Sequence, residues 1–390
     1  MRISRNRLVR AGLVGGFLAV LGLTGCSTTD TFEQPEPLPD IDNAVEIDTV
    51  WSRSIGDGHD GEFLYLAPLN TGDVIYAASA DGELVAVDAE NGKRLWEKDL
   101  DDRIFAGVGG DGIQLYLVTR EADLLALSRD DGHELWRVAL PTEALAAPQS
   151  NGKSVVVQTT DGRVLAFDIK TGDKLWQYDG VVPVLTMRAV AAPLVGSDII
   201  IASFPSGKLI ALAADSGQPL WQYDVGLPKG RTELERLVDI AGQPLVVDTA
   251  LLVVSYQGRL ALVDIRTGQE IWNRKASSLH SPMIGGDDIY LTLANGDVTA
   301  LRGSDRRELW VQDKLEWRQV TGPMVYKDYL VVGDYEGYLH VLSREDGRLL
   351  GQKKFDGEGI RVPVQRLSNG NLLVFGNGGK LAAIAIQPED

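Results

Sequence analysis

The chain contains very little of the chemistry on which most catalytic and metal sites depend. It has one cysteine, Cys26, in 390 residues, which excludes intramolecular disulfides and thiolate metal clusters. The four histidines, His59, His133, His280 and His340, are far apart and show no HExxH spacing, so a metal site has no support. Basic residues are also few, 38 against 55 acidic ones, and the net charge of −17 argues against nucleic-acid binding.

Motifs for nucleophilic catalysis or nucleotide binding are missing as well. Neither GxSxG nor a Walker loop occurs, and Gly107–Gly112 matches GxGxxG formally but is followed by the strand-like run IQLYLV instead of a helix. We interpret this segment as a glycine-rich turn between strands. The carboxylates Asp88, Asp168 and Asp264 recur at one position of a repeat, which indicates turn capping. We therefore predict no catalytic residues and no cofactor.

The N-terminus has the layout of a secretory signal. Residues 1–10 carry four arginines and no acid, and residues 11–23 are an uncharged apolar run, shorter than the roughly 20 residues that a spanning helix needs. This pattern predicts a signal peptide over residues 1–25, with a retained transmembrane anchor as the weaker alternative. The sequence Leu23-Thr24-Gly25-Cys26 resembles the lipobox of bacterial lipoproteins, which implies that Cys26 is lipidated. The alternative is an incidental cysteine after an ordinary secretory signal.

The segment that follows is rich in proline and acids and has little to bury. Residues 26–44 are therefore predicted to comprise the lipidated Cys26 and a flexible tether. By resemblance to lipoproteins, Ser27 in place of aspartate favours sorting to the outer membrane.

A repeated pattern fills the rest of the chain. Each copy has a strand-like apolar run, a turn, Gly-x-Leu with alternating apolar residues, a second turn, and an aliphatic residue followed by Trp. The seven visible copies span residues 81–96, 122–136, 161–176, 206–221, 257–272, 295–310 and 336–351. An eighth begins at Gly379 and stops before its Trp, while an unmatched Val50-Trp51 stands near the start of the domain.

This period predicts a single all-β domain over residues 45–390, an eight-bladed β-propeller of four-stranded antiparallel blades. Successive tryptophans from Trp51 to Trp310 lie 38 to 51 residues apart, enough for four short strands with their turns. The two incomplete ends together make one unit, so we expect the N-terminal strand to complete the C-terminal blade. We assign the tryptophans to packing between blades.

Two connections are longer than the others and are the candidate binding surface. The first, residues 181–193, offers Leu185, Met187 and Arg188; the second, residues 226–244, offers charged side chains. Aliphatic anchors beside an arginine suit a protein interface. The alternative, equally open on sequence, is that Leu185 and Met187 only cover the blade while Arg188 pairs with a loop acid.

The repeats resemble the quinoprotein-like class of propellers, and the whole chain resembles the BamB family, the propeller lipoproteins of the outer-membrane β-barrel assembly machine (the BAM complex). The most specific segments are LTMR at 185–188 and TELERLVDI at 232–240. The resemblance implies a scaffold that faces the periplasm, binds the periplasmic domains of BamA and assists barrel insertion, with unfolded barrel proteins as further partners. It implies partner contacts by Leu185, Met187, Arg188 and Asp239, supported by Glu233 and Arg236. The family often has a second acid where this chain has Ala241, which predicts a weaker acidic contact.

Two other functions stay open. Quinone-dependent dehydrogenases share the blade pattern, but they are longer and carry vicinal cysteines and calcium-binding acids that this chain lacks. A ligand-sensing propeller is the third possibility.

Overall fold

The computed structural model describes residues 33–188 and 191–388, of which those from Pro35 onward belong to one compact unit. Cys26 and the predicted signal peptide lie outside the described residues. The described part contains 32 strands, one short 3-10 helix and no α-helix, and it has no helix long and apolar enough to cross a membrane.

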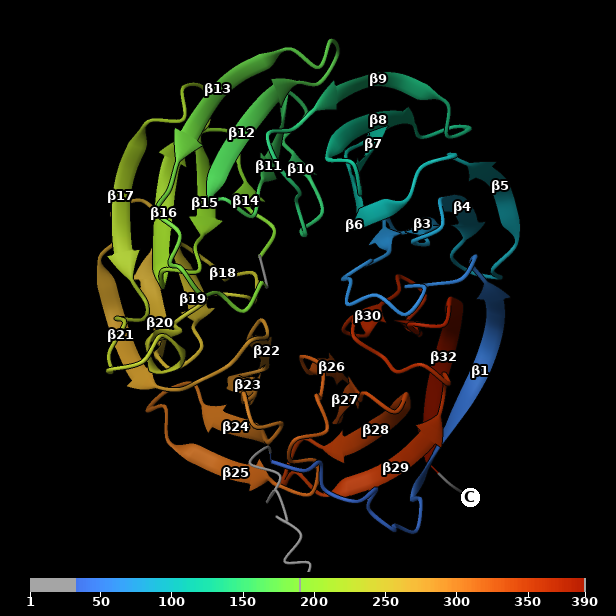
Figure 1. Cartoon of the computed structure of the whole chain (residues 1–390). Coiled ribbons are helices and arrows are strands. Elements are labelled where there is room, and N and C mark those ends of the chain that lie inside the picture. The colour runs from blue at the N-terminus through green and yellow to red at the C-terminus, as the bar shows by residue number, and fades with distance from the viewer. Residues whose placement is uncertain (1–32, 189–190, 389–390) are drawn as a thin grey trace, which may run out of the picture. The chain divides into compact units, whose positions relative to one another are not determined.

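The strands form eight four-stranded antiparallel sheets arranged as blades around a common axis (Figure 1), as the sequence predicted. The first four blades comprise β2 (Leu69–Asn70), β3 (Val74–Ala78), β4 (Glu83–Asp88), β5 (Arg94–Asp99); β6 (Ile104–Gly110), β7 (Gln114–Thr119), β8 (Asp123–Ser128), β9 (Glu134–Ala139); β10 (Gln149–Ser150), β11 (Ser154–Gln158), β12 (Arg163–Asp168), β13 (Lys174–Asp179); and β14 (Leu194–Val195), β15 (Ile199–Ser203), β16 (Lys208–Ala213), β17 (Pro219–Asp224). The next three comprise β18 (Leu245–Val247), β19 (Ala250–Val254), β20 (Arg259–Asp264), β21 (Glu270–Lys275); β22 (Met283–Gly285), β23 (Asp288–Thr292), β24 (Val298–Arg302), β25 (Glu308–Gln312); and β26 (Met324–Tyr326), β27 (Tyr329–Gly333), β28 (Tyr338–Ser343), β29 (Leu349–Lys354).

The eighth blade is built from both ends of the domain. It contains β30 (Gln365–Arg366), β31 (Leu372–Phe375), β32 (Lys380–Pro388) and, as its outer strand, β1 (Val45–Ser54). β1 pairs with β32 from Val45 opposite Pro388 to Ser54 opposite Lys380. This pairing closes the ring and confirms the predicted completion of the split repeat.

In six blades the tryptophan of the outer strand packs on a turn glycine of the following blade. A Cβ added to the turn glycine would lie closer than 3.0 Å to the preceding indole, so only glycine leaves room for the ring. The six glycine–tryptophan pairs are Gly92–Trp51, Gly132–Trp96, Gly172–Trp136, Gly217–Trp176, Gly268–Trp221 and Gly347–Trp310. Each of these indoles also donates its Nε1 hydrogen to a backbone carbonyl of the same turn, at 2.9 to 3.2 Å. Apolar burial and a satisfied N–H therefore join neighbouring blades at each of these contacts.

Two blades depart from this rule for identifiable reasons. In the sixth blade Arg306 stands at the turn position with a φ of +60°, and its guanidinium lies 4.9 Å from the Trp272 ring centroid. In the seventh blade Gly351 replaces the tryptophan. The turn on which a tryptophan would pack does not exist in the eighth blade, where the third and fourth strands are the two chain ends. Gly351 instead leaves room for Val45 of β1.

The interpretation of Gly107–Gly112 as a turn was wrong for its first four residues. Gly107 to Gly110 belong to β6, and only Asp111 and Gly112 lie in the turn before β7. A Cβ on Gly107 would overlap the backbone of Ala67, and one on Gly109 would overlap the Pro148 carbonyl oxygen. The glycines permit close approach of neighbouring blades, a need that sequence reasoning could not detect.

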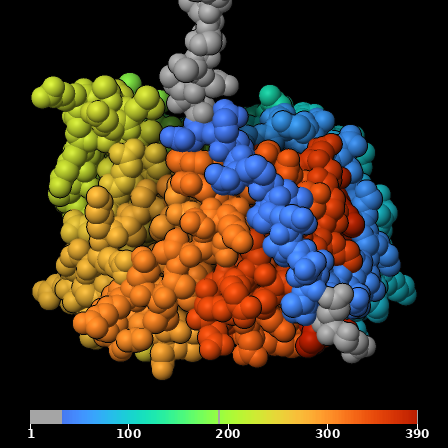
Figure 2. Space-filling model, turned by 90° about the horizontal axis from the view of Figure 1, so that it is seen from below, coloured from blue at the N-terminus to red at the C-terminus, as the bar shows by residue number. Residues whose placement is uncertain are grey.

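The segment from Pro35 to Ala44 lies against the propeller, whereas the sequence predicted a flexible tether up to residue 44. Figure 2 shows this segment, in blue, crossing the outside of the ring. The Arg318 guanidinium donates to the Glu36 carbonyl at 2.9 Å, and Gln352 exchanges hydrogen bonds with Asn43. Arg318 itself is buried and paired with Asp334 at 2.7 Å, which fixes the donor of this hydrogen bond.

Replacing Gly217 by alanine tests the tryptophan packing. Its Cβ would overlap Trp176 at a φ of +68°, so we expect a loss of unfolding free energy of about 2 to 4 kcal/mol. Gly152 is the matched control because its φ is +80° and nothing lies near its Cβ, so alanine there should cost only the backbone part, about 1 kcal/mol. Urea denaturation measures both losses. Equal losses would show that the indole contact contributes nothing.

Candidate docking surface

Every connection between consecutive blades opens on the same side of the ring, because each blade has four strands of alternating direction. We name this side the connection face. Its eight loops are residues 55–68, 100–103, 140–148, 180–193, 225–244, 276–282, 313–323 and 355–364. The two connections that the sequence analysis selected, residues 181–193 and 226–244, lie in the loops 180–193 and 225–244, which are consecutive in this series and flank the fourth blade. Gln243 Nε2 donates to the Ala192 carbonyl at 3.2 Å and ties one loop to the other.

A capping box shapes the tip of the longer loop. Thr232 Oγ1 accepts the Glu235 N–H at 3.2 Å, and Glu235 Oε2 accepts the Thr232 N–H at 3.2 Å. These bonds join the residue before the N-cap to the second residue of a 3-10 turn, η1 (Leu234–Arg236), whose N-cap, Glu233, makes no side-chain capping bond. They also lower the pKa of the Glu235 carboxyl, chiefly through N–H bonds from Arg231 and Thr232.

Four predicted contact residues are exposed on this loop and its neighbour, and a fifth is half-buried. Glu233, Arg236 and Arg188 are exposed, Leu185 is 38% exposed, and Met187 is half-buried. Arg188 has a left-handed φ of +51° and pairs with Glu143 at 2.7 Å, yet its side chain remains 64% exposed. The ion pair with Glu143 fits the alternative in which Arg188 only pairs with a loop acid. The exposure leaves most of the Arg188 side chain accessible to a partner.

Asp239 does not belong to the exposed surface, contrary to its expected role as a direct contact. Its side chain is fully buried, and Oδ2 accepts the backbone N–H of Met187. Among the described residues Oδ1 has no hydrogen-bond partner. Asp239 therefore fastens the loop carrying Leu185 and Arg188 to the loop carrying η1. Ala241, where the family often has a second acid, is half-buried.

Burial changes the acidity of Asp239. Loss of water around the carboxylate raises its pKa from 3.8 to about 6, and the Met187 N–H bond opposes the rise only in part. At neutral pH the group is thus ionised at an energetic cost. The charge makes the hydrogen bond to Met187 a strong one.

Sequence reasoning missed two features of the connection face. Leu234, at the tip of η1, is 67% exposed and is the apolar residue of that turn, although only its charged neighbours were selected. The loop 55–68 is a third long connection, and its Phe63 is 76% exposed with the Arg361 guanidinium 3.8 Å from the ring centroid. An aliphatic residue between charges, and an aromatic one in the glycine-rich run IGDGHDGEF, were the available signals.

No group of three or more His, Cys, Asp or Glu side chains that could hold a metal ion occurs within residues 33–188 and 191–388.

Comparisons with known proteins place the chain in context. A family model described as "Outer membrane protein assembly factor BamB" matches residues 44–106 and 80–312. The protein of that name from Marinobacter adhaerens is 74% identical over 390 residues, the full length of both chains. The crystal structure of BamB from Moraxella catarrhalis has a TM-score of 0.79 at 28% identity, covering 87% of this chain and 99% of that one. A quinohemoprotein alcohol dehydrogenase from Comamonas testosteroni, with a TM-score of 0.67 at 12% identity over 88% of this chain and 78% of that one, shares the fold alone.

Replacing Asp239 by asparagine tests the buried link. The amide can still accept the Met187 N–H but carries no charge, so the variant should lack the cost of burying a carboxylate. Because the folded pKa is raised, the stability of the wild type relative to the variant should fall as pH rises from about 4 to about 6, by up to about 3 kcal/mol, and then stay constant. Unfolding free energies of both proteins at pH 4 and pH 7.5 measure this. A difference that does not change with pH would contradict the assignment.

Proposed function

Since this chain belongs to the BamB family of outer membrane protein assembly factors, we propose that it acts as a non-catalytic scaffold in the BAM complex, where it helps β-barrel proteins fold and insert. The family membership supports the assembly role. The geometry supports the scaffold, because a rigid ring presents two hydrogen-bonded loops on one face.

The observation that carries the proposal is the link from buried Asp239 to the backbone of Met187. It fixes Leu185 and Arg188 beside η1 before any partner arrives, which reduces the entropy lost on binding. We name the exposed set Leu185, Arg188, Leu234 and Arg236 the docking patch. Aliphatic anchors with arginine are the composition of interface hot spots.

We propose the periplasmic domains of BamA as the partner of the docking patch, following the family resemblance of LTMR and TELERLVDI. Unfolded barrel proteins are a second proposed class of partner. The free edges of the outer strands, such as β13 and β17, could accept an added strand through main-chain hydrogen bonds.

The proposed location is the periplasmic side of the outer membrane, with Cys26 as the lipidated residue. Several acyl chains on one residue would anchor the protein stably, whereas a single chain holds a protein only marginally. The lipobox resemblance and the position of Ser27 support this assignment.

Replacing Arg188 by alanine should remove co-purification with the barrel-forming subunit without unfolding the propeller. A hot-spot arginine contributes about 2 kcal/mol or more to binding. Arg348 is the matched control, since it is 73% exposed and also has a single acidic partner, Asp346, but lies on the opposite face. Arg348→Ala should co-purify normally.

Replacing Glu143 by glutamine separates docking from blade covering. If Arg188 acts only by pairing with Glu143, this variant should fail as completely as Arg188→Ala. If Arg188 contacts the partner, Glu143→Gln should retain most of the co-purification. Unchanged co-purification of Arg188→Ala would overturn the docking proposal.

The second candidate function, a quinone-dependent dehydrogenase, is favoured only by the shared fold. Titrating the purified protein with pyrroloquinoline quinone and calcium should give neither stoichiometric binding nor dye reduction. Tight binding with dye reduction would replace the scaffold by an enzyme, and tight binding without turnover would favour a ligand-sensing propeller.

A further inference from the structure

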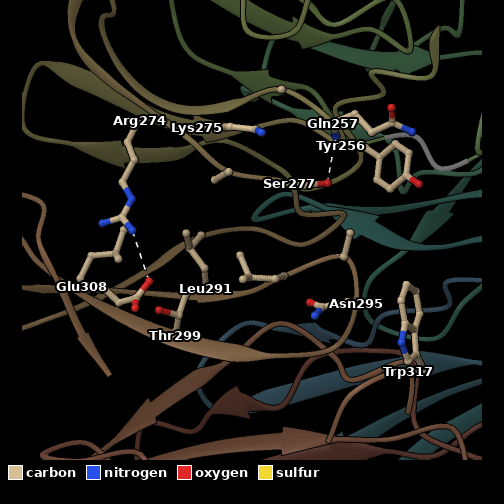
Figure 3. A pocket seen from close by; sticks show the side chains of 15 residues that line it. Tyr256, Gln257, Arg274, Lys275, Ser277, Leu291, Asn295, Thr299, Glu308 and Trp317 are labelled. Carbon is tan, nitrogen blue, oxygen red and sulfur yellow. Dashed lines mark hydrogen bonds and ion pairs between the residues drawn. The ribbon is translucent and has the colours of Figure 1, made fainter. Parts of the chain in front are cut away.

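A pocket of about 710 Å³ lies between the fifth and sixth blades and opens toward the connection face (Figure 3). The fifth blade contributes Arg274 and Lys275 from the end of β21, and the sixth contributes Leu291 and Leu301 as an apolar floor. This volume lies within the range of small binding sites in proteins. We name it the interblade pocket.

One position of the repeat lies at the bottom of the pocket. The third strand of each blade directs this position toward the preceding blade, and in the first four blades it is a buried large aliphatic residue. Those residues are Val85, Leu125, Leu165 and Ile210. The sixth blade has Thr299 there, whose Oγ1 donates to the Trp310 carbonyl at 3.0 Å. The fifth, seventh and eighth blades have Ala261, His340 and Ala382 at this position, so a large aliphatic residue occurs there only in the first four blades. Thr299, Leu291 and Leu301 are buried at the bottom of the pocket.

The mouth of the pocket is fixed by strained backbone. Gln257 and Trp317 have left-handed φ values of +47° and +58°, which non-glycine residues rarely adopt. The Gln257 N–H donates to Ser277 Oγ at 2.9 Å, and the Trp317 N–H donates to the Asn295 carbonyl at 2.5 Å. Trp317 is thereby held at the rim, where its indole remains partly exposed.

The pocket is continuous with the docking patch. Gln257 Nε2 donates to the carbonyl oxygen of Leu234 in η1 at 3.3 Å. The docking patch and the rim of the pocket therefore meet at Gln257, in the turn between β19 and β20 of the fifth blade.

The charged side chains at the wall of the pocket indicate which kind of ligand the pocket would bind. In the third and fourth blades the corresponding cross-strand positions hold ion pairs, Arg163 with Asp179 at 3.4 Å and Lys208 with Asp224 at 2.7 Å. In the fifth blade Arg259 stands opposite a second cation, Lys275.

Arg259 bonds the carbonyls of Asp224 and Val225 and lies 3.6 Å from Glu270. Arg274 is engaged by Glu308 at 3.3 Å. Lys275 makes no hydrogen bond or ion pair within the described residues. On a chain of net charge −17, this exposed cation beside an apolar floor is matched to a carboxylate from outside.

We propose that the interblade pocket binds an extended polypeptide segment in which an aromatic or large aliphatic side chain enters between the blades and an adjacent acidic residue pairs with Lys275. The proposal rests on the proposed function in one respect, that a protein partner occupies the connection face. It adds a second binding site of defined chemistry to that face.

The test uses the mature protein and a direct binding assay. The probe is the N-acetylated, amidated peptide Gly-Asp-Phe-Asp-Gly, compared with Gly-Lys-Phe-Lys-Gly and Gly-Asp-Gly-Asp-Gly. Saturation-transfer NMR detects weak binding and gives the Kd by titration. We expect saturable binding of the first peptide alone, with the phenyl protons receiving the strongest transfer.

Two variants locate the binding. Thr299→Leu introduces the large aliphatic side chain of the first four blades at the bottom of the pocket, so it should weaken binding of the acidic peptide about tenfold. Lys275→Glu should reverse the preference in favour of the lysine peptide. Lys153→Glu, an equal charge change in an exposed turn on the opposite face, should leave the Kd unchanged.

The outcomes separate this proposal from the docking proposal. Equal binding to the wild type and to Thr299→Leu, or no binding of the acidic peptide at millimolar concentration, would overturn the interblade site. Arg188→Ala should bind the peptide normally even while it loses co-purification. Peptide binding that disappears in Arg188→Ala would place the peptide at the docking patch and would also overturn the site.

Discussion

The structure depends on one repeated contact, the indole of an outer strand lying on a turn glycine of the next blade. It joins blades that share no strand pairing, and it explains why the ring tolerates loops of very different length on the connection face. Where the contact is altered, the neighbouring residues compensate in a specific way. Arg306 covers Trp272 in the sixth blade, and Gly351 admits the strand that completes the eighth. A rigid ring of this kind supplies a base on which irregular loops can be held in one arrangement.

The docking patch shows how such a base is used. Its loops lack regular structure apart from η1, and they are ordered instead by a capping box and by a single buried carboxylate. Burying an ionised acid with one hydrogen-bond partner destabilises the fold. In return, the bond holds the two loops in one defined arrangement. Leu234, the exposed apolar residue of one loop, is thus positioned by the capping box of Thr232 and Glu235. The arrangement of the docking patch thus depends on the hydrogen bonds of Asp239 and of the capping box as much as on the exposed residues themselves.

The sequence predicted the fold almost completely because the information is repeated. The same pattern of strands, turns and tryptophan recurs in most blades, so a misassigned residue does not change the predicted fold. The incomplete repeats at the two ends of the domain predicted the closing blade directly. The site was predicted less well because its features occur once. Nothing in the residues around Asp239 distinguishes an exposed acid from a buried one, and the burial follows from a backbone contact with Met187, 52 residues away. The need for glycine in β6 and the docking of the segment from Pro35 likewise arise from contacts with residues distant in the sequence. A periodic sequence pattern does not reveal such contacts.

The pairing of β1 with β32 also sets the order in which the molecule can be completed. β1 spans residues 45–54 and its partner β32 spans residues 380–388, so the eighth blade cannot form until β32 has been made. Through that interval β1 is an unpaired strand, open to pairing with other chains. Its charged residues Glu46 and Asp48 oppose such association. A chain that lacks β32 therefore cannot close the ring. β1 and β32 are as necessary to the fold as the residues of the core.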